Sequence, residues 1–365
     1  MALLHRPGHK NPLRKAGDPL RIVAIGGGTG LSTLLKGLKR YSLGAVAPAP
    51  NQPALIDITA VVTVTDDGGS SGRLRREFDI LPPGDIRNCM VALSEDESLL
   101  SQVFNYRFDY GRGLKGHSFG NLFLTALTKI TGDFAHAVRL SSEVLAISGR
   151  IFPSTSVNVS LRAHLAGGRT VDGETRISRS AVPIERIELV PANPAPIEET
   201  LEAIRGADLI TLGPGSLFTS VIPNLLVKGI AQAIRKSKGL TACLVNLMWQ
   251  PGETSGFSAS DHVRQILSHA GAAASRQRFL DYAVVNTEPI ADELLISYAR
   301  NRAMQVANDI DALRQLGIEV VALPLLASGP KVRHDPDKLA RIVVELAKKG
   351  RRNILRLQLE KEKRR

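Results

Sequence analysis

Two adjacent carboxylates, Asp66 and Asp67, stand between an apolar segment and a glycine-serine turn in the stretch TVTDDGGSSGRLRR. Carboxylates in such a place can hold Mg²⁺, accept hydrogen bonds from the hydroxyls of a sugar, or cap the turn that follows them. Because successive side chains of an extended strand point to opposite sides, we expect only one of the two to face a ligand. The loops that fold beside this pair decide which chemistry it performs.

Small polar loops rich in glycine follow four apolar segments that are typical of strands; they span residues 26–30, 66–73, 213–216 and 250–256. Glycine lets the backbone approach a phosphate closely, and a helix that begins there offers free N–H groups and the positive end of its dipole. In a parallel sheet, loops of this kind gather beyond the carboxyl ends of the strands. Together they predict a broad site for a nucleotide-type ligand, which carries phosphates and hydroxyls.

No complete catalytic or phosphate-loop motif accompanies these loops in the sequence. The first loop is neither a full G-x-G-x-x-G nor a Walker loop, since no Lys follows Gly30. His117 stands where a helix is expected to begin, but a general base needs an oriented partner, and the sequence shows none. Arg73 could clamp a phosphate, although with two further arginines nearby a solvated helix face explains it as well.

The elements that position these loops follow from the hydrophobic pattern. Residues 22–25 form a continuous apolar run, as in a strand buried on both faces, and the leucines after the first glycine loop recur at helical spacing. A further stripe that is typical of a core-facing helix consists of Phe119, Leu122, Phe123, Leu127 and Ile130. This alternation of strands and helices predicts an α/β protein with a mostly parallel sheet covered on both faces. Within about residues 151–190, apolar residues alternate at Val157, Val159 and Leu161 and Gly-Gly and Asp-Gly turns follow, which predicts an antiparallel β insertion.

The domain organisation follows from composition and charge. We expect a disordered basic lead-in at 1–20, a single α/β domain at 21–345 and a basic C-terminal tail at 346–365. The net charge of +12 lies mostly at the ends: residues 1–21 carry five Lys/Arg against one Asp, and residues 348–365 carry nine against two Glu. The body is therefore close to neutral, which argues against a nucleic-acid-binding groove.

The two cysteines, Cys89 and Cys243, provide neither a disulfide framework nor a zinc cluster, and they suit a reducing cytoplasm. No run of eighteen apolar residues is present, so no membrane span is expected. The N-terminus lacks the apolar segment of a signal peptide. A cytoplasmic location follows as an expectation.

Six motifs resemble one known family. GGGTGLSTLLKGLK, TVTDDGGSSGRLR, LPPGDIRNC, HSFGNLFLTALT, GPGSLFTSVIPNLLV and QPGETSGFSASDHV are similar to the bacterial gluconeogenesis-factor family, proteins that bind UDP-N-acetylglucosamine. That family is a branch of the 2-phospho-L-lactate transferase superfamily. The similarity runs in order from about Arg21 to residues 333–340. One departure is Trp249, which stands where the family usually has a smaller residue and which puts the size of the adjoining pocket in doubt.

The resemblance implies a Rossmann-like three-layer fold, frequent dimerisation, a UDP-sugar as ligand, and a role in cell shape and cell-wall (peptidoglycan) synthesis on gluconeogenic carbon sources. It also implies that the first glycine loop and the GPGS loop contact the nucleotide. Loops and resemblance together indicate these candidate ligand-binding residues: Gly27, Gly28, Thr29, Gly30, Asp66, Asp67, Ser70, Asn121, Gly213, Pro214, Gly215, Ser216, Gln250, Thr254, Tyr298 and Arg333.

Two functions are compatible with these residues. The favoured one is a non-catalytic regulatory protein that senses a UDP-sugar, forms a homodimer and signals to an unidentified protein partner. The alternative is a Mg²⁺-dependent transferase that moves a phosphoester group from a guanylylated donor to a deazaflavin alcohol, with Asp66 as the metal ligand. No cofactor is expected for the first, and catalytic residues are left unassigned.

Overall fold

The computed structural model describes residues 14–15, 17–42, 56–94, 99–272 and 278–362 of the 365-residue chain. At its centre lies a seven-stranded sheet in which all pairs are parallel, in the order β10-β9-β8-β7-β1-β2-β3. The strands are β1 (Leu20–Gly26), β2 (Ile56–Val62), β3 (Arg150–Pro153), β7 (Leu209–Leu212), β8 (Leu240–Leu244), β9 (Tyr282–Asn286) and β10 (Glu319–Leu323). The inner strands are mostly apolar and buried along almost their whole length because helices cover both of their faces.

The order of these strands reverses direction between β1 and β7. From β1 the chain builds outward through β2 and β3, then returns to β7 on the other side of β1 and builds outward again. This is the order of a doubly wound Rossmann sheet, in which ligands bind at the point of reversal, beyond the carboxyl ends of the strands. The glycine loops after β1 and β7 lie at this point.

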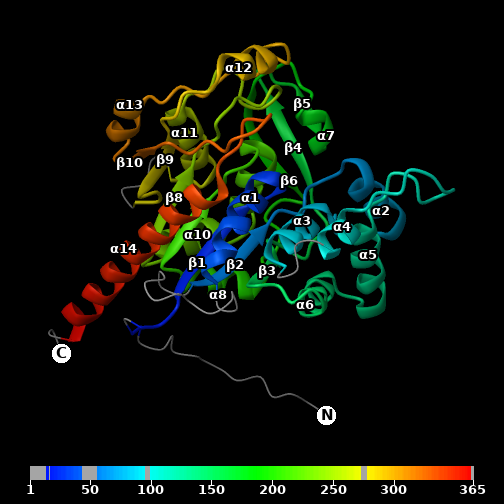
Figure 1. The fold of residues 1–365 in the computed structure, drawn as a ribbon, viewed down its shortest axis with the longest axis horizontal. Coiled ribbons are helices and arrows are strands. Elements are labelled where there is room, and N and C mark those ends of the chain that lie inside the picture. Colours follow the sequence, from blue (N-terminus) through cyan, green and yellow to red (C-terminus); the bar gives the residue numbers. More distant parts are fainter. Residues whose placement is uncertain (1–13, 16, 43–55, 95–98, 273–277, 363–365) are drawn as a thin grey trace.

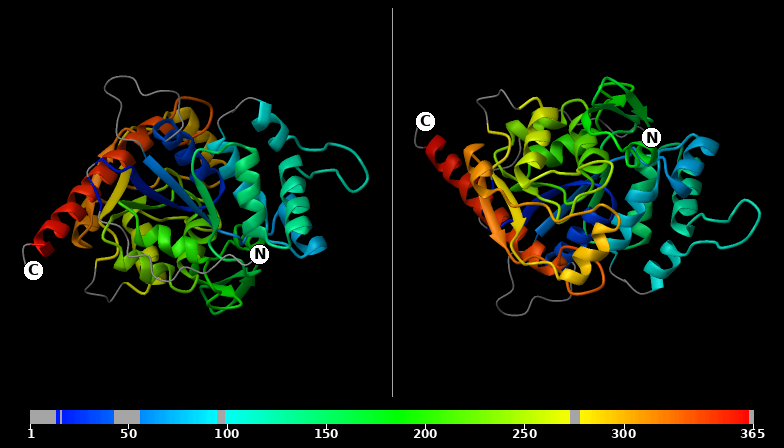
Figure 2. Two further views of the ribbon diagram at one scale, coloured as in Figure 1. Left: turned by 90° about the horizontal axis from the view of Figure 1, so that it is seen from below. Right: turned by 90° about the horizontal axis from the view of Figure 1, so that it is seen from above.

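Helices form a layer on each face of the sheet (Figures 1 and 2). One layer contains α1 (Gly28–Leu38), α3 (Gly84–Leu93) and α14 (Pro336–Glu362). The other contains the π-helix at Leu217–Val221, α8 (Glu198–Arg205), α9 (Ile222–Leu225) and α10 (Ile230–Lys236). The short helix η1 (Lys39–Tyr41) follows α1. Helices α11 (Ala259–His269) and α13 (Ile310–Gln315) pack against each other, α13 also contacts β10, and α12 (Asp292–Ala299) follows β9 in the chain. The expected three-layer α/β fold is confirmed.

A separate three-stranded antiparallel sheet, in the order β5-β4-β6, forms the insertion. It contains β4 (Ser160–Leu165), β5 (Thr170–Asp172), the short helix α7 (Glu174–Ile177) and β6 (Ile184–Val190). The expected start at residue 151 is wrong, because Arg150–Pro153 pairs in parallel with β2 as the edge strand β3 of the main sheet. The apolar residues at 151–152 supply a sheet edge here, so the pattern alone could not mark the boundary.

A group of helices covers the β3 edge of the main sheet: α2 (Gly69–Phe78), α3, α4 (Leu99–Asn105), α5 (Phe119–Thr131) and α6 (Phe134–Val144) (Figure 1). The expected core-facing stripe of α5 is confirmed only in part, because Phe123 packs against the core and Leu122 and Leu127 are half-buried. The buried residues of this helix are Gly120, Asn121, Leu124, Thr125 and Thr128, whereas Phe119 and Ile130 are exposed. The structure packs the more polar side of α5 inward, next to the loops after β2, where hydroxyl and amide groups find partners.

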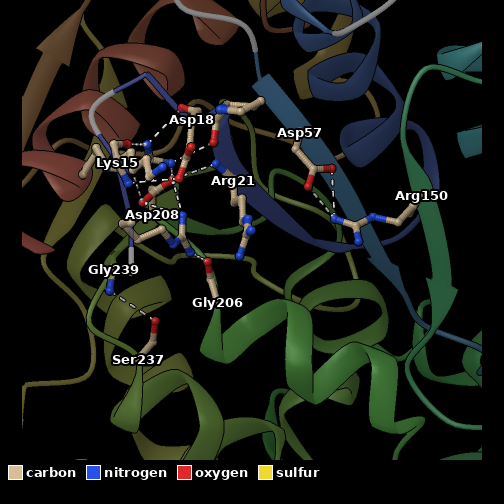
Figure 3. A network of polar contacts seen from close by, with 12 residues as sticks. Lys15, Asp18, Arg21, Asp57, Arg150, Gly206, Asp208, Ser237 and Gly239 are labelled. Atoms are coloured by element: carbon tan, nitrogen blue, oxygen red, sulfur yellow. Dashed lines mark hydrogen bonds and ion pairs between the residues drawn. The ribbon is translucent and has the colours of Figure 1, made fainter. Parts of the chain in front are cut away.

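The expected basic tail at 346–365 is also wrong as far as residue 362, because these residues complete α14. Leu346, Ala347 and Ile354 are buried, and the Arg351 guanidinium binds the buried Asp208 carboxylate at 2.6 and 2.9 Å. Arg351 also donates to the carbonyls of Lys15, Asp18 and Pro19, so the described part of the lead-in lies against α14. Figure 3 shows Lys15 and Asp18 gathered around Asp208.

The described residues leave part of the lead-in untested and bear on the expected absence of a membrane span. Residues 1–13 of the lead-in and the proline-rich loop at 43–55 lie outside the described residues. Within the described residues, no single helix combines the length and apolar character needed to cross a membrane; one sharply bent pair, Leu217–Leu225 with Ile230–Lys236, meets the criteria of length and composition jointly. The homodimer stays a prediction.

Candidate functional site

A cavity of about 260 Å³ lies where the strand order reverses. Its walls come from the loops after β1, β7 and β8, from α12 and from the segment before α14. They consist of Gly27, Gly28, Thr29, Gly30, Thr33, Pro214, Gly215, Ser216, Ser220, Asn246, Leu247, Met248, Trp249, Gln250, Tyr298, Val332, Arg333 and His334. We call this the main pocket.

The floor of the main pocket is the N-terminus of α1. Gly28 begins this helix with φ +61°, a conformation that favours glycine, and Gly27 before it is extended. At Gly30 a Cβ atom would lie 2.4 Å from the Pro214 carbonyl oxygen, so only glycine lets α1 approach the GPGS loop this closely. The first turn of α1 thus presents backbone N–H groups and a positive dipole end to the pocket, which is a site for an anion such as phosphate.

The loops after β7 and β8 are tied together by side-chain amides. Asn246 Oδ1 accepts from the Gly215 backbone N–H at 3.2 Å, and Asn246 Nδ2 donates to the Gly215 carbonyl at 2.8 Å. Gln250 Nε2 donates to Ser216 Oγ at 2.7 Å. Behind this wall, Thr254 is fully buried and its hydroxyl accepts from the Gln250 backbone N–H. These contacts hold the pocket in shape before a ligand arrives.

The upper wall of the main pocket is apolar and aromatic. Trp249 is half-buried, and its indole N–H donates to the Phe257 carbonyl at 2.8 Å, which fixes the ring. Tyr298 accepts a hydrogen bond from the Val332 backbone N–H through its hydroxyl. The indole ring of Trp249 therefore lines the pocket in a fixed orientation. Aromatic rings in such positions stack on the flat faces of nucleobases.

The charge of the main pocket favours an anion. None of its lining residues is an Asp or Glu. Arg333 is exposed at the rim, and within the described part of the chain its guanidinium has no hydrogen-bond or ion-pair partner. Arginine binds phosphate well because its planar donors match two oxygens at once.

The carboxylates after β2 lie outside the main pocket and have separate tasks. Asp67 Oδ1 accepts from the backbone N–H and the hydroxyl of Thr175, at 2.9 and 2.6 Å, and so fastens α7 of the insertion to the main sheet. Asp66 Oδ1 accepts from the Gly68 backbone N–H at 2.8 Å. The two side chains diverge, as expected from their adjacent positions.

Asp66, Asp85 and Glu174 form an acidic cluster behind the glycine loop. Asp85 accepts a hydrogen bond from the Gly28 backbone, which joins this cluster to the floor of the main pocket. Burial raises the pKa of Asp85 to about 6, and the nearby charge of Asp66 adds to the effect. Burial also raises the pKa of Glu174 to about 9, with further contributions from Asp66 and Asp85. The pKa of Asp66 itself is raised by burial.

The cluster bears on the possible metal ligand Asp66. Among the described residues, no three of the His, Cys, Asp and Glu side chains are arranged to hold a metal ion. Mg²⁺ is commonly held by only one or two carboxylates together with the phosphates of a substrate, however. Asp66 and Asp85 are the carboxylates that could serve in this way. The magnesium site stays a prediction.

Ser70, His117 and Asn121 meet between the N-termini of α2 and α5. Ser70 Oγ lies 2.9 Å from His117 Nδ1 and accepts from Asn121 Nδ2 at 3.1 Å. The sequence showed no partner for His117, and the structure supplies this hydroxyl. Burial lowers the pKa of His117, which favours its neutral form. The Oδ1 atom of the buried Asn121 has no partner among the described residues.

The structure therefore divides the sequence-based candidates into groups. Ten line the main pocket: Gly27, Gly28, Thr29, Gly30, Pro214, Gly215, Ser216, Gln250, Tyr298 and Arg333. The others, which do not, are Asp66, Asp67, Ser70, Asn121, Gly213 and Thr254. Arg73 also lies elsewhere and donates to the Lys115 carbonyl at 2.8 Å.

Asn246 and Glu174 lie at the site although the sequence pattern did not indicate them. Asn246 lies two residues after the end of β8 and resembles an ordinary strand-end residue, so no signal marked it. Glu174 lies in the insertion, more than one hundred residues from Asp66 in the chain, and only the fold brings them together.

Replacing Glu174 by Gln is expected to raise the free energy of unfolding at pH 8 by up to about 5 kcal/mol, since pH 8 lies about 3.5 units above the ordinary pKa. Because its pKa of about 9 exceeds the ordinary value of 4.5, the folded protein retains a proton that the unfolded chain releases. This contribution to stability is fully present below pH 4.5 and is lost as the pH rises towards 9. Urea unfolding measured from pH 4.5 to 9 should therefore show that the variant has a higher free energy of unfolding than the wild type at pH 8, and that this difference vanishes near pH 4.5. Glu143→Gln, at an exposed position of α6, should show no gain; an equal gain at every pH would contradict the prediction.

The family model of 2-phospho-L-lactate transferase CofD matches residues 22–326. The chain is 44% identical over 325 residues to a protein named gluconeogenesis factor from Halalkalibacterium halodurans, covering 89% of this chain and 95% of that one. A protein of the same name from Bacillus subtilis is 44% identical, with 91% and 99% covered. A crystal structure of a Bacillus halodurans protein superposes with a TM-score of 0.83 at 43% identity, covering 90% and 100%.

Proposed function

The chain belongs to the 2-phospho-L-lactate transferase CofD family. We propose that it is a gluconeogenesis factor that binds UDP-N-acetylglucosamine without converting this UDP-sugar to a product, and that its ligand-bound form regulates metabolism. In this proposal a protein partner recognises the ligand-bound form and adjusts cell shape and peptidoglycan synthesis on gluconeogenic carbon sources. The homodimer expected from the family would be the form that binds.

The observation that carries this proposal is the main pocket at the reversal of the strand order. It combines the N-terminus of α1, an arginine without a partner among the described residues, and walls without a carboxylate. A diphosphate satisfies all three features, since it is an anion with several acceptor oxygens. The held indole of Trp249 suits a nucleobase.

The direct test is a titration with UDP-N-acetylglucosamine, followed by calorimetry and by the fluorescence of Trp249, the only tryptophan of the chain. We expect saturable binding, a change in fluorescence and no product. Replacing Arg333 by Ala should weaken binding about 10-fold to 100-fold, since hydrogen bonds to a charged group contribute about 1.5–3 kcal/mol. Arg341→Ala, at an exposed position of α14, is the matched control and should bind like the wild type. Absence of binding in the wild type would reject the proposal.

A second candidate function is the transferase that gives the family its name. The acidic cluster of Asp66, Asp85 and Glu174 beside the glycine loop favours it, because carboxylates near phosphates are where a catalytic Mg²⁺ is held. The test is incubation with GTP or a guanylylated donor, Mg²⁺ and a deazaflavin alcohol. Metal-dependent transfer that Asp66→Asn removes, while donor binding persists, would establish the enzyme.

A further inference from the structure

A second cavity of about 250 Å³ adjoins the main pocket. It lies between α1, α3 and α4, and three residues line both cavities: Thr29, Thr33 and Arg333. We call it the side cavity. A pocket for a drug-sized ligand typically has about 300–1,000 Å³, so neither cavity alone reaches that size, whereas the two together do.

The two cavities differ in chemistry. The main pocket has the aromatic and apolar wall of Leu247, Met248 and Trp249. The side cavity is lined mainly by hydroxyls and amides, among them Ser32, Asn88, Ser101 and Asn105. Such groups donate and accept hydrogen bonds, as the hydroxyls of a sugar do. Val91 and Ala92 add a small apolar area to this wall, where a methyl group can pack.

The charged residues at the junction of the two cavities favour a diphosphate between them. The side cavity contains Lys36 and Arg333 and no Asp or Glu among its lining residues. The N-terminus of α1 lies at the junction, because Thr29 in its first turn lines both cavities. A diphosphate placed there has the helix dipole below it and Arg333 beside it, and its two ends point into the two cavities.

We propose that the side cavity receives the sugar of the bound UDP-sugar, while the diphosphate crosses the N-terminus of α1 and the uridine lies in the main pocket against Trp249. This inference rests on the proposed function, which concerns binding alone. It adds that the amide and hydroxyl groups of α3 and α4 select the sugar. The pocket then distinguishes a UDP-sugar from UDP by contacts outside the main pocket.

The test compares UDP with UDP-N-acetylglucosamine on the full-length protein. Ser101→Phe fills the side cavity from α4. We expect it to lower the affinity for UDP-N-acetylglucosamine at least 10-fold and to leave the affinity for UDP within twofold. Asn105→Phe, from the next turn of α4, should act in the same way and serves if the first variant does not fold. Ser268→Phe, at an exposed position of α11, is the matched control and should change neither affinity.

The outcomes separate this inference from the proposal beneath it. If the side-cavity variants bind UDP-N-acetylglucosamine as the wild type does, or lose UDP and the UDP-sugar equally, the sugar does not lie there, while the UDP-sugar-binding function stands. If the wild type binds neither compound, the proposed function fails, and this inference fails with it.

Discussion

Replacing Gly30 by Ala is expected to lower the affinity for UDP-N-acetylglucosamine by about 100-fold. The new Cβ would lie 2.4 Å from the Pro214 carbonyl oxygen and 2.8 Å from the Gly215 Cα. Both are backbone atoms, so α1 and the GPGS loop must move apart, and they form the floor and wall of the main pocket. Losing two hydrogen bonds to a charged phosphate, each of about 1.5 kcal/mol, corresponds to about 100-fold.

Alanine also has a higher helix propensity than glycine, by about 1 kcal/mol, but steric overlap in a packed region costs about 1–3 kcal/mol, so a net loss of stability is expected as well. Gly350→Ala separates the two effects. There the Cβ would lie 2.0 Å from the Asp208 carbonyl oxygen, at the opposite end of the sheet from the pocket. It should destabilise the protein and leave the ligand affinity unchanged when both are measured by calorimetry. Equal losses of affinity in the two variants would show that the effect at Gly30 is not local.

Replacing Arg351 by Ala is expected to lower the free energy of unfolding by about 3 kcal/mol, the largest loss of stability that we predict. Asp208 is fully buried, and Arg351 supplies two of its hydrogen bonds, at 2.6 and 2.9 Å. Removal leaves the carboxylate with Arg14 and the Arg21 backbone N–H as its remaining described partners. Figure 3 shows Asp208 at the centre of this network. A buried charge that loses an ion-pair partner is costly because water cannot replace it.

The measurement is urea unfolding, with Arg352→Ala as the matched control. Arg352 is the next residue of α14, is exposed, and should cost less than about 0.5 kcal/mol. Arg351 also holds the carbonyls of Lys15, Asp18 and Pro19, so its loss should speed proteolysis of the N-terminal segment. Equal stability of the two variants would mean that Asp208 finds another partner.

The sequence alone was sufficient for the fold class and for most of the main pocket. Strand β1 is a continuous aliphatic run, and α1 has leucines on one face, because each must be buried against the other. The turn at Gly28 is also a local signal, since its positive φ favours glycine, whereas Gly30 is required by the close approach of the distant Pro214. Strand β1, helix α1 and the turn at Gly28 depend on residues that are close in the chain, so the sequence pattern indicates them.

Only the tertiary structure decided which partners the buried charged and polar side chains contact. It places Asp67 on Thr175 of the insertion and Asp66 beside Asp85 and Glu174, so the acid pair of the sequence faces two different partners and not one ligand. It leaves Phe119 and Ile130 of the α5 stripe exposed, and it makes residues 346–362 of the expected basic tail part of a helix that Asp208 holds through Arg351. These outcomes depend on burial and on partners from other elements, some of them more than one hundred residues away, as for Asp67 with Thr175 and Asp208 with Arg351. The free energy of a buried charge or amide depends on such partners. Residue type and spacing do not contain that information.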